Sequence, residues 1–380
     1  MAKSIKVYLD YASSALAESA NPSAIHELGM IEKKKLESAR ARIAKVLGAR
    51  AEEIIFTSGA TESNNLAILG MPRGHIVTTN IEHASVLETG KYRGNVTFVP
   101  VEENGIVDPK KIKKALRKDT VLVSVMYANN EIGTIQPIRE IAKEIRHWNR
   151  ANKNKVFFHT DAVQAVNYLP INVVGLGVDM LSLNAAKIYG PKGVGILFVK
   201  KYTPLRPIMH GGDQERGLRP GTENAEGAEA IARALQLAEK IKASEVTRLT
   251  KLRDHFIYSL IRANKGIVVN GSLKNRLPNN VNIIIPNIPS DLLVIELSAR
   301  GIMASAKSAC KAGDGKDSHV IMALRKKDGL LAKAPPAERA GLASAGSLRF
   351  SLGRKTTKKE IDYTTAALKD ILKKLKKWYD

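Results

Sequence analysis

Short apolar runs alternate with amphipathic stretches along the first two thirds of the chain. The runs predict strands over residues 53–57, 75–78, 96–99, 121–127, 156–160, 180–183 and 194–199. The stretches between them predict helices over residues 23–47, 58–69, 85–91, 109–117 and 137–150, with Gly48 ending the first. This alternation favours an α/β fold in which helices cover both faces of a mostly parallel sheet.

A long amphipathic stretch over residues 228–263 follows a glycine-rich loop and separates this pattern from the rest of the chain. Beyond it the apolar pattern predicts strands over residues 281–285 and 347–350 and helices over residues 290–300, 318–324 and 358–375. We therefore expect two domains. The large domain would comprise residues 11–240, and a smaller α+β domain would combine residues 241–380 with a short first strand in residues 1–10.

The composition is that of a globular protein, with 44% hydrophobic and 26% charged residues in 380. No apolar run reaches the roughly 18 residues of a membrane helix, and residues 1–10 do not resemble a signal peptide, so we expect a cytoplasmic protein with no membrane partner. The net charge of +23 would suit nucleic acid, but the lysines are scattered and aromatic residues rarely lie between them. We interpret them as solvated helix faces.

Candidate chemistry begins at Lys187, which ends an apolar run and precedes a turn rich in glycine and proline. A lysine held in this way is suited to Schiff-base formation, most often with pyridoxal phosphate, although a surface lysine entering a turn explains the same pattern. Ala60 and Thr61 lie where a strand turns into a helix, which indicates either a phosphate site or an ordinary helix cap.

Further polar groups follow the predicted strands, where a parallel sheet gathers functional side chains at one edge. These groups are His83, Asn130, Asp161 and Gln164. The single cysteine, Cys310, excludes an internal disulfide and a multi-cysteine metal site. Its thiol is either a small buried group or a reactive one.

Taken together, these motifs resemble the cysteine desulfurases of the NifS/IscS type, in the class V aminotransferase family of fold type I pyridoxal-phosphate enzymes. The resemblance covers nearly the whole chain. It rests on residues 8–11, 57–63, 82–83, 129–133, 161–164, 187–193, 210–212, 216, 219–222, 308–310 and 349–354.

The resemblance implies pyridoxal 5'-phosphate as the cofactor and a role for each candidate residue. Lys187 would carry the cofactor, Asp161 would pair with its ring nitrogen, and His83 would stack on the ring. The remaining cofactor contacts would come from Gln164 at the ring hydroxyl, from Ala60, Thr61 and Asn184 at the phosphate, from Asn130, and from Thr222 of the neighbouring subunit. A homodimer with shared sites is therefore implied.

The implied reaction converts L-cysteine to L-alanine and leaves the sulfur as a persulfide on Cys310. Lys187 and His83 would be the other catalytic residues, and Arg349, with Asn130, would bind the substrate. The sulfur would pass to an acceptor such as an iron–sulfur scaffold protein or into tRNA thiolation. Three alternatives stay open: a selenocysteine lyase or other class V enzyme, a degenerate sulfur carrier without catalysis, and a basic RNA-binding protein.

The sequence departs from the family pattern at the cofactor lysine. Related enzymes usually have Ser-Gly-His-Lys where this chain has Asn184-Ala185-Ala186-Lys187. Losing one charge-assisted phosphate contact costs about 1.5–3 kcal/mol, or roughly 10- to 150-fold in affinity, so we predict weaker cofactor retention. The segment of residues 13–20 is also short, which alters the expected entrance, and Lys307 stands where relatives often have glycine.

Overall fold

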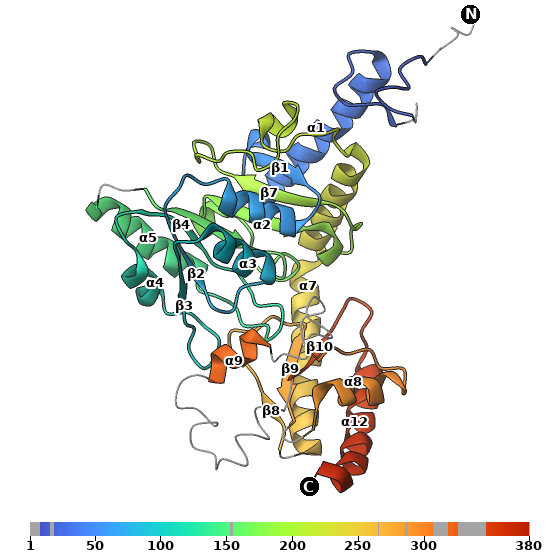
Figure 1. Ribbon diagram of the computed structural model, residues 1–380. Helices are drawn as coiled ribbons and strands as arrows, with labels where there is room; N and C mark the ends of the chain where they lie inside the picture. The colour runs from blue at the N-terminus through green and yellow to red at the C-terminus, as the bar shows by residue number, and fades with distance from the viewer. Residues whose placement is uncertain are drawn as a thin grey trace, which may run out of the picture.

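A seven-stranded sheet forms the larger part of the molecule (Figure 1). The computed structural model describes residues 8–15, 19–152, 155–264, 266–285, 288–306, 318–325 and 347–379. In spatial order the strands are β1 (Ile54–Thr57), β7 (Gly195–Val199), β6 (Met180–Asn184), β5 (Phe157–Asp161), β4 (Thr120–Ser124), β2 (His75–Thr79) and β3 (Val96–Val99). Strand β7 is antiparallel to both its neighbours, and the other pairs are parallel. The prediction of a mostly parallel sheet is confirmed.

Helices cover both faces of this sheet, and strands that are buried in this way need apolar cover on two sides; only the edge strand β3 is largely half-buried. One face is packed by α1 (Glu27–Leu47), α4 (Pro109–Ala115), α5 (Ile138–Asn152), α6 (Val173–Leu176) and the first half of α7 (Ala225–Ala263). The other is packed by α2 (Ala60–Leu69) and α3 (Ala84–Arg93). Gly48 ends α1 in the left-handed conformation, as predicted, with φ 66°.

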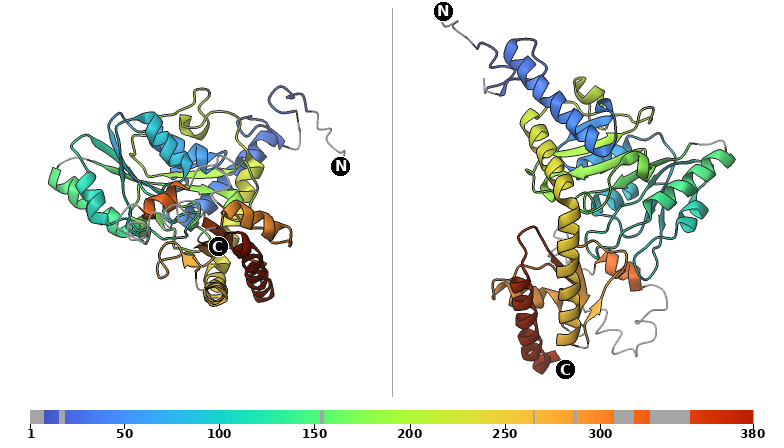
Figure 2. Two further views of the ribbon diagram at one scale, coloured as in Figure 1. Left: turned by 60° about the horizontal axis from the view of Figure 1, so that its bottom comes forward. Right: turned by 180° about the vertical axis from the view of Figure 1, so that it is seen from behind.

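A three-stranded antiparallel sheet forms a second body. Its order is β10 (Ser347–Ser351), β9 (Asn280–Ile284) and β8 (Val268–Val269), and it packs with α8 (Ser290–Ser298) and α12 (Lys358–Tyr379). Helix α7 runs through both bodies without a break (Figure 2). Its Leu235 belongs to the core of the large sheet, whereas Leu249 and Phe256 belong to the core of the small one. Residue 240, the predicted domain boundary, lies inside this helix.

Residues 1–7 of the first strand predicted from the sequence lie outside the described residues, and its described remainder, Tyr8 to Asp10, forms no strand. The ring of Tyr8 packs edge-on against Tyr11 and His26, and Asp10 Oδ2 lies 3.1 Å from His26 Nε2. These contacts hold Tyr8 and Asp10 beside the start of α1 and not beside the small sheet.

Helix α1 also begins later than the predicted residue 23, because His26 acts as its N-cap and accepts a hydrogen bond from the Gly29 amide at 3.2 Å. Among the residues that the structure describes, no helix is both long and apolar enough to cross a membrane.

Candidate active site

A cavity of about 340 Å³ opens where β2, β4, β5 and β6 end and where β10 of the small sheet approaches them. Its walls bring together most of the predicted site residues: Ala60, Thr61, His83, Asn130, Asp161, Gln164, Asn184, Lys187 and Arg349. These residues come from both bodies of the molecule. Thr222 lies in a different hollow, Cys310 and Lys307 lie outside the described residues, and no described residue of the segment 13–20 lines the cavity.

Asp161 is the last residue of β5, and its carboxylate is buried at the wall of the cavity. Its Oδ2 accepts a hydrogen bond from Asn64 Nδ2 at 2.8 Å, and its Oδ1 accepts one from the Val163 amide at 3.0 Å. Asn64 Nδ2 also donates to Ser85 Oγ at 2.9 Å, and Ser85 Oγ lies 2.8 Å from His83 Nδ1. Both oxygens of Asp161 are therefore fixed, and the network connects this carboxylate to His83.

Lys187 lies in a short 3₁₀ helix, η3 (Ala185–Lys187), directly after β6. Asn184 caps this turn, since its Oδ1 accepts a hydrogen bond from the Ala186 amide at 3.1 Å. On the other side, Asn167 Nδ2 donates to the main-chain oxygen of Lys187 at 2.6 Å. The backbone of Lys187 is thus held from both sides, while its side chain is exposed at the cavity.

The start of α2 is the place where the sequence predicts an anion site or an ordinary helix cap. Gly59 precedes the helix with φ 155°, a conformation that side chains rarely allow. A Cβ built on Gly195 would lie 2.6 Å from Gly59 Cα, so β7 and this turn can approach this closely because residue 195 is glycine. Asn184 Nδ2 lies 3.8 Å from the corresponding Cβ position of Gly59. The Thr61 hydroxyl, the amides of the first helical turn and the Asn184 amide group therefore gather at one end of the cavity.

Arg349 reaches the same cavity from β10. It lies opposite Asn282 of β9, and its main chain also forms two hydrogen bonds with Ser305, at 3.1 and 2.7 Å. Its Nη1 donates to the main-chain oxygen of Asn130 at 3.0 Å. A guanidinium held at this wall is suited to bind a carboxylate.

Sequence reasoning assigned no role to several residues that build the site. Asn64, Ser85 and Asn167 make the contacts described above, and Tyr189 lines the cavity two residues after Lys187. A polar pair, Ser63-Asn64, on the buried side of an apolar helix was the one signal that pointed to Asn64. The others depend on partners far away in the sequence.

Glu82 is buried beside the site, and burial raises the pKa of its carboxyl group to about 8. The Thr79 hydroxyl donates to it at 2.6 Å and the Met126 amide at 2.9 Å. Its main-chain oxygen lies 2.9 Å from His319 Nε2, on α9 (His319–Arg325). Glu82 therefore joins the edge of the sheet to the helix that follows the segment carrying Cys310.

Comparisons with known proteins show what this chain is similar to. The family model for class-V aminotransferases matches residues 3–364. A cysteine desulfurase IscS of Dictyoglomus turgidum is 42% identical over 98% of this chain and 95% of its own length. The solved structure of a NifS-like protein has a TM-score of 0.82 at 36% identity and covers 94% of this chain and 92% of its own. The solved structure of SspA in complex with cysteine has a TM-score of 0.70 at 32% identity and covers 88% of this chain and 90% of its own.

Proposed function

Because the chain belongs to the class-V aminotransferase family, we propose that it is a pyridoxal-phosphate-dependent cysteine desulfurase. The observation that carries this proposal is the single cavity that Lys187, Asp161 and Arg349 share. The three side chains provide an amine, a buried carboxylate and a guanidinium, which are the groups needed to hold the cofactor and an amino acid together. The relative from Dictyoglomus turgidum, which is named for this activity, matches nearly the full chain.

The residues present fit pyridoxal 5'-phosphate. The Asp161 carboxylate, with both oxygens oriented, suits a protonated ring nitrogen, and Gln164 lies in the same wall for the ring hydroxyl. The start of α2 with Thr61, together with the Asn184 amide group, suits the phosphate. When bound at Lys187, the cofactor supplies an electron sink for the substrate's α-carbon.

The protein's own groups then have defined tasks. Arg349 binds the carboxylate of L-cysteine, and Asn130, whose main-chain oxygen accepts from Arg349, lies beside it. In this proposal Lys187 moves the proton at the α-carbon, and His83, which lines the same cavity, is the stacking and acid–base group. The Cys310 thiolate attacks the substrate sulfur, so an S–S bond forms and the C–S bond breaks. The β-carbon takes the bond electrons and a proton, which gives L-alanine and a persulfide on Cys310.

Product analysis with single substitutions tests this proposal. Purified protein supplied with pyridoxal phosphate is expected to show the absorbance band of a lysine-linked cofactor and to release one alanine per persulfide formed from L-cysteine. Lys187→Ala should abolish the band, whereas Cys310→Ala should keep the band and lose persulfide and alanine formation. Alanine formation that persists in Cys310→Ala would contradict the role of Cys310. Turnover of selenocysteine without a Cys310 requirement would favour a lyase, and a wild type with no band would favour a non-catalytic carrier.

We also propose a homodimer in which Thr222 reaches the cofactor phosphate of the partner subunit. Thr222 lies with Ser58, Gly193 and Arg219 in a hollow separate from the cavity of its own chain. The preceding loop is anchored by a buried ion pair, in which Arg40 Nη2 donates to Glu215 Oε1 at 2.7 Å. A fixed loop that presents Thr222 away from its own cavity is what a shared site requires.

Subunit mixing tests the shared site. Lys187→Ala and Thr222→Asp proteins should each be inactive, because one lacks the amine and the other places a negative charge beside the phosphate. A mixed dimer contains one site with both native residues, so mixing after mild dissociation should restore activity. Mixtures that stay as inactive as their components, although size measurements show that dimers have re-formed, would contradict the assignment of Thr222.

For the pathway, we propose that the persulfide sulfur passes to an acceptor such as an iron–sulfur scaffold protein or enters tRNA thiolation. We propose the cytoplasm as the compartment, because reducing conditions keep a lone cysteine such as Cys310 in the thiol form. We retain a large domain up to residue 240 and a small domain after it, since the two cores of the molecule meet along α7.

A further inference from the structure

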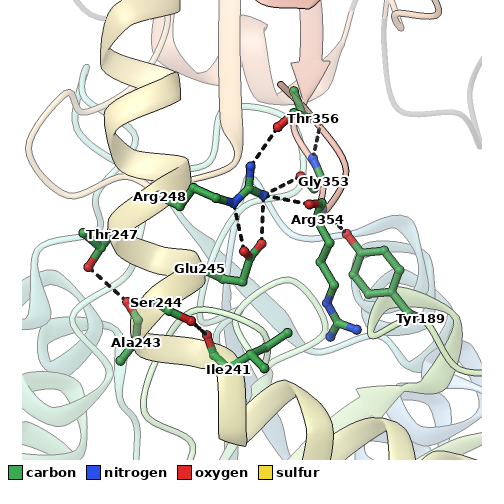
Figure 3. Close-up of polar contacts among 10 residues, drawn as sticks. All are labelled: Tyr189, Ile241, Ala243, Ser244, Glu245, Thr247, Arg248, Gly353, Arg354 and Thr356. Atoms are coloured by element: carbon green, nitrogen blue, oxygen red, sulfur yellow. Dashed lines mark hydrogen bonds and ion pairs between the residues drawn. The ribbon is translucent and has the colours of Figure 1, made fainter. Parts of the chain in front are cut away.

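A cluster of side chains joins the turn after Lys187 to the turn after β10 (Figure 3). The Arg354 amide donates to the hydroxyl oxygen of Tyr189 at 2.9 Å, and the Arg354 guanidinium lies over the Tyr189 ring at 4.0 Å from its centroid. Tyr189 has φ 65°, which is unfavourable for a tyrosine backbone by about 1–3 kcal/mol. The Tyr189 side chain, whose backbone has this unfavourable conformation, thus makes two contacts with Arg354 of the small body.

Arg248 of α7 holds the same turn from its other side. Its guanidinium donates to the main-chain oxygens of Thr356 at 2.7 Å, Gly353 at 2.9 Å and Arg354 at 3.1 Å. Glu245 orients it through two further hydrogen bonds, each 2.9 Å long. The turn is also closely packed, since a Cβ built on Gly353 would lie 3.1 Å from the Tyr189 hydroxyl. Turn 353–356 is thus fixed between α7 and Tyr189.

This cluster lies where the two bodies of the molecule meet, close in sequence to both Lys187 and Arg349. Arg248 lies on the part of α7 between Leu235, the last residue that this helix contributes to the large core, and Leu249, the first that it contributes to the small core. Tyr189 is two residues from Lys187, and the turn begins two residues after the strand that carries Arg349. The cluster therefore links the segment that carries Lys187 to the strand that carries Arg349, the two residues proposed for opposite ends of the substrate.

We propose that Tyr189, Arg354 and Arg248 are positioning residues that set the separation of Lys187 and Arg349 and so select substrates with amine and carboxylate on one carbon. This inference rests on the proposed function, in which Lys187 marks the amine end and Arg349 the carboxylate end. An α-amino acid has a fixed distance between these groups. A misplacement of about 1 Å can cost roughly 100-fold in rate, so the two bodies need such a connection.

Two substitutions separate the hydrogen bond between Tyr189 and Arg354 from the contact of the Arg354 guanidinium with the Tyr189 ring. Tyr189→Phe keeps the ring beneath the guanidinium and removes the oxygen that accepts from the Arg354 amide. Arg354→Met keeps that amide, which belongs to the main chain, and removes the cation. Arg248→Met removes the three contacts with carbonyl oxygens. Tyr202→Phe is a matched control, because Tyr202 also has positive φ, at 69°, and a lysine over its ring, but it is exposed and lies away from the cavity.

The measurement compares L-alanine with β-alanine, whose amine and carboxylate are two carbons apart. Their dissociation constants follow from perturbation of the cofactor absorbance in the full-length protein. Tyr189→Phe removes one hydrogen bond and should weaken L-alanine binding about 2- to 10-fold. Arg354→Met and Arg248→Met should weaken L-alanine binding as well, and all three should change β-alanine binding less. KM for L-cysteine should rise in parallel, more than kcat falls. The proposal would be overturned if all three variants kept the wild-type ratio of the L-alanine and β-alanine dissociation constants. It would also be overturned if Tyr202→Phe changed this ratio as much as the cluster variants do.

A second readout does not depend on the cofactor. Amide hydrogen exchange at Arg354 reports its hydrogen bond to Tyr189 directly, and exchange across residues 353–356 reports the hold of Arg248. Tyr189→Phe should speed exchange at Arg354, and Arg248→Met should speed it across the turn. Wild-type protein that takes up no cofactor would refute the proposed function, while unchanged exchange in the variants would refute the connection itself.

Discussion

Replacing Ala186 by histidine should tighten cofactor binding. Ala186 directly precedes Lys187 and lines the cavity with an exposed side chain, so there is room for an imidazole. Asn184 Oδ1 is used by the Ala186 amide, which leaves the Asn184 Nδ2 group near Gly59 at the start of α2, where the phosphate is expected. Over residues 184–186 this chain therefore offers the phosphate one neutral donor, where the related enzymes usually have a serine and a histidine.

The size of the effect follows from one added charge-assisted hydrogen bond. Such a bond contributes about 1.5–3 kcal/mol, or roughly 10- to 150-fold in affinity. Because position 186 is exposed, water screens the interaction, and we expect about 10-fold. The charge-assisted form needs the imidazolium, so the gain should be larger at pH 6 than at pH 8. Asn184→Ala should weaken binding by a similar factor, since it loses both the donor and the cap of η3.

The assay is an equilibrium titration of cofactor-free protein with pyridoxal phosphate, followed by the absorbance of the lysine-linked form. Ala186→Leu is the control, because it fills a similar space without a donor and should change Kd less than about twofold. Equal Kd values for wild type, Ala186→His and Ala186→Leu would refute the reasoning that the missing histidine limits cofactor retention. So would wild-type protein that keeps its full cofactor content through extended dialysis.

Two further predictions concern the substrate arginine and the buried glutamate. Arg349→Lys should raise KM for L-cysteine about 10-fold with a smaller change in kcat, because lysine cannot bind a carboxylate with two parallel hydrogen bonds; alanine assays giving KM within twofold of wild type would contradict this. Glu82 has a folded-state pKa of about 8 against an ordinary value of 4.5, so its stabilising effect is present below pH 4.5 and is lost as the pH rises through 8. In thermal unfolding, the Tm of Glu82→Gln should therefore rise relative to the Tm of wild type between pH 5 and pH 9. A Tm difference that stays constant over this range would count against the raised pKa.

The apolar pattern was sufficient to predict the strands of the large sheet and the edge where the site lies, but it missed the two-residue strand β8 of the small sheet. Asp161 and Asn184 end neighbouring parallel strands, so the topology alone brings them to one edge. The orientation of β7 was not predictable, because buried parallel and antiparallel strands show the same continuous apolar runs. The start of α1 was misplaced because a histidine, an unusual N-cap, begins it at His26.

The contacts that orient the site residues were beyond sequence reasoning because each joins distant parts of the chain. Asn64 holds Asp161 across 97 positions, and Asn167 holds the Lys187 carbonyl across 20. Arg248 reaches Gly353 across 105 positions. A single sequence shows that these residues are polar, but not which partner satisfies them. Periodicity therefore predicted where the functional groups gather, and tertiary contacts determine how they are oriented.

Further contacts hold the described residues on either side of the segment that carries Cys310, which itself lies outside the described residues. The described residues before and after its segment are anchored to the cavity wall: Ser305 pairs with the main chain of Arg349, and Ser318 Oγ donates to Glu131 Oε2 at 2.5 Å. Glu131 is adjacent to Asn130, and its main-chain oxygen accepts from Asn280 and Asn282 of the small sheet, at 2.9 and 3.1 Å. The described residues on either side of the segment are therefore tied to Arg349 and Glu131, next to the position proposed for the substrate carboxylate. A displacement of Arg349 would also move Ser305, so in the proposed reaction substrate binding and sulfur transfer depend on the same part of the fold.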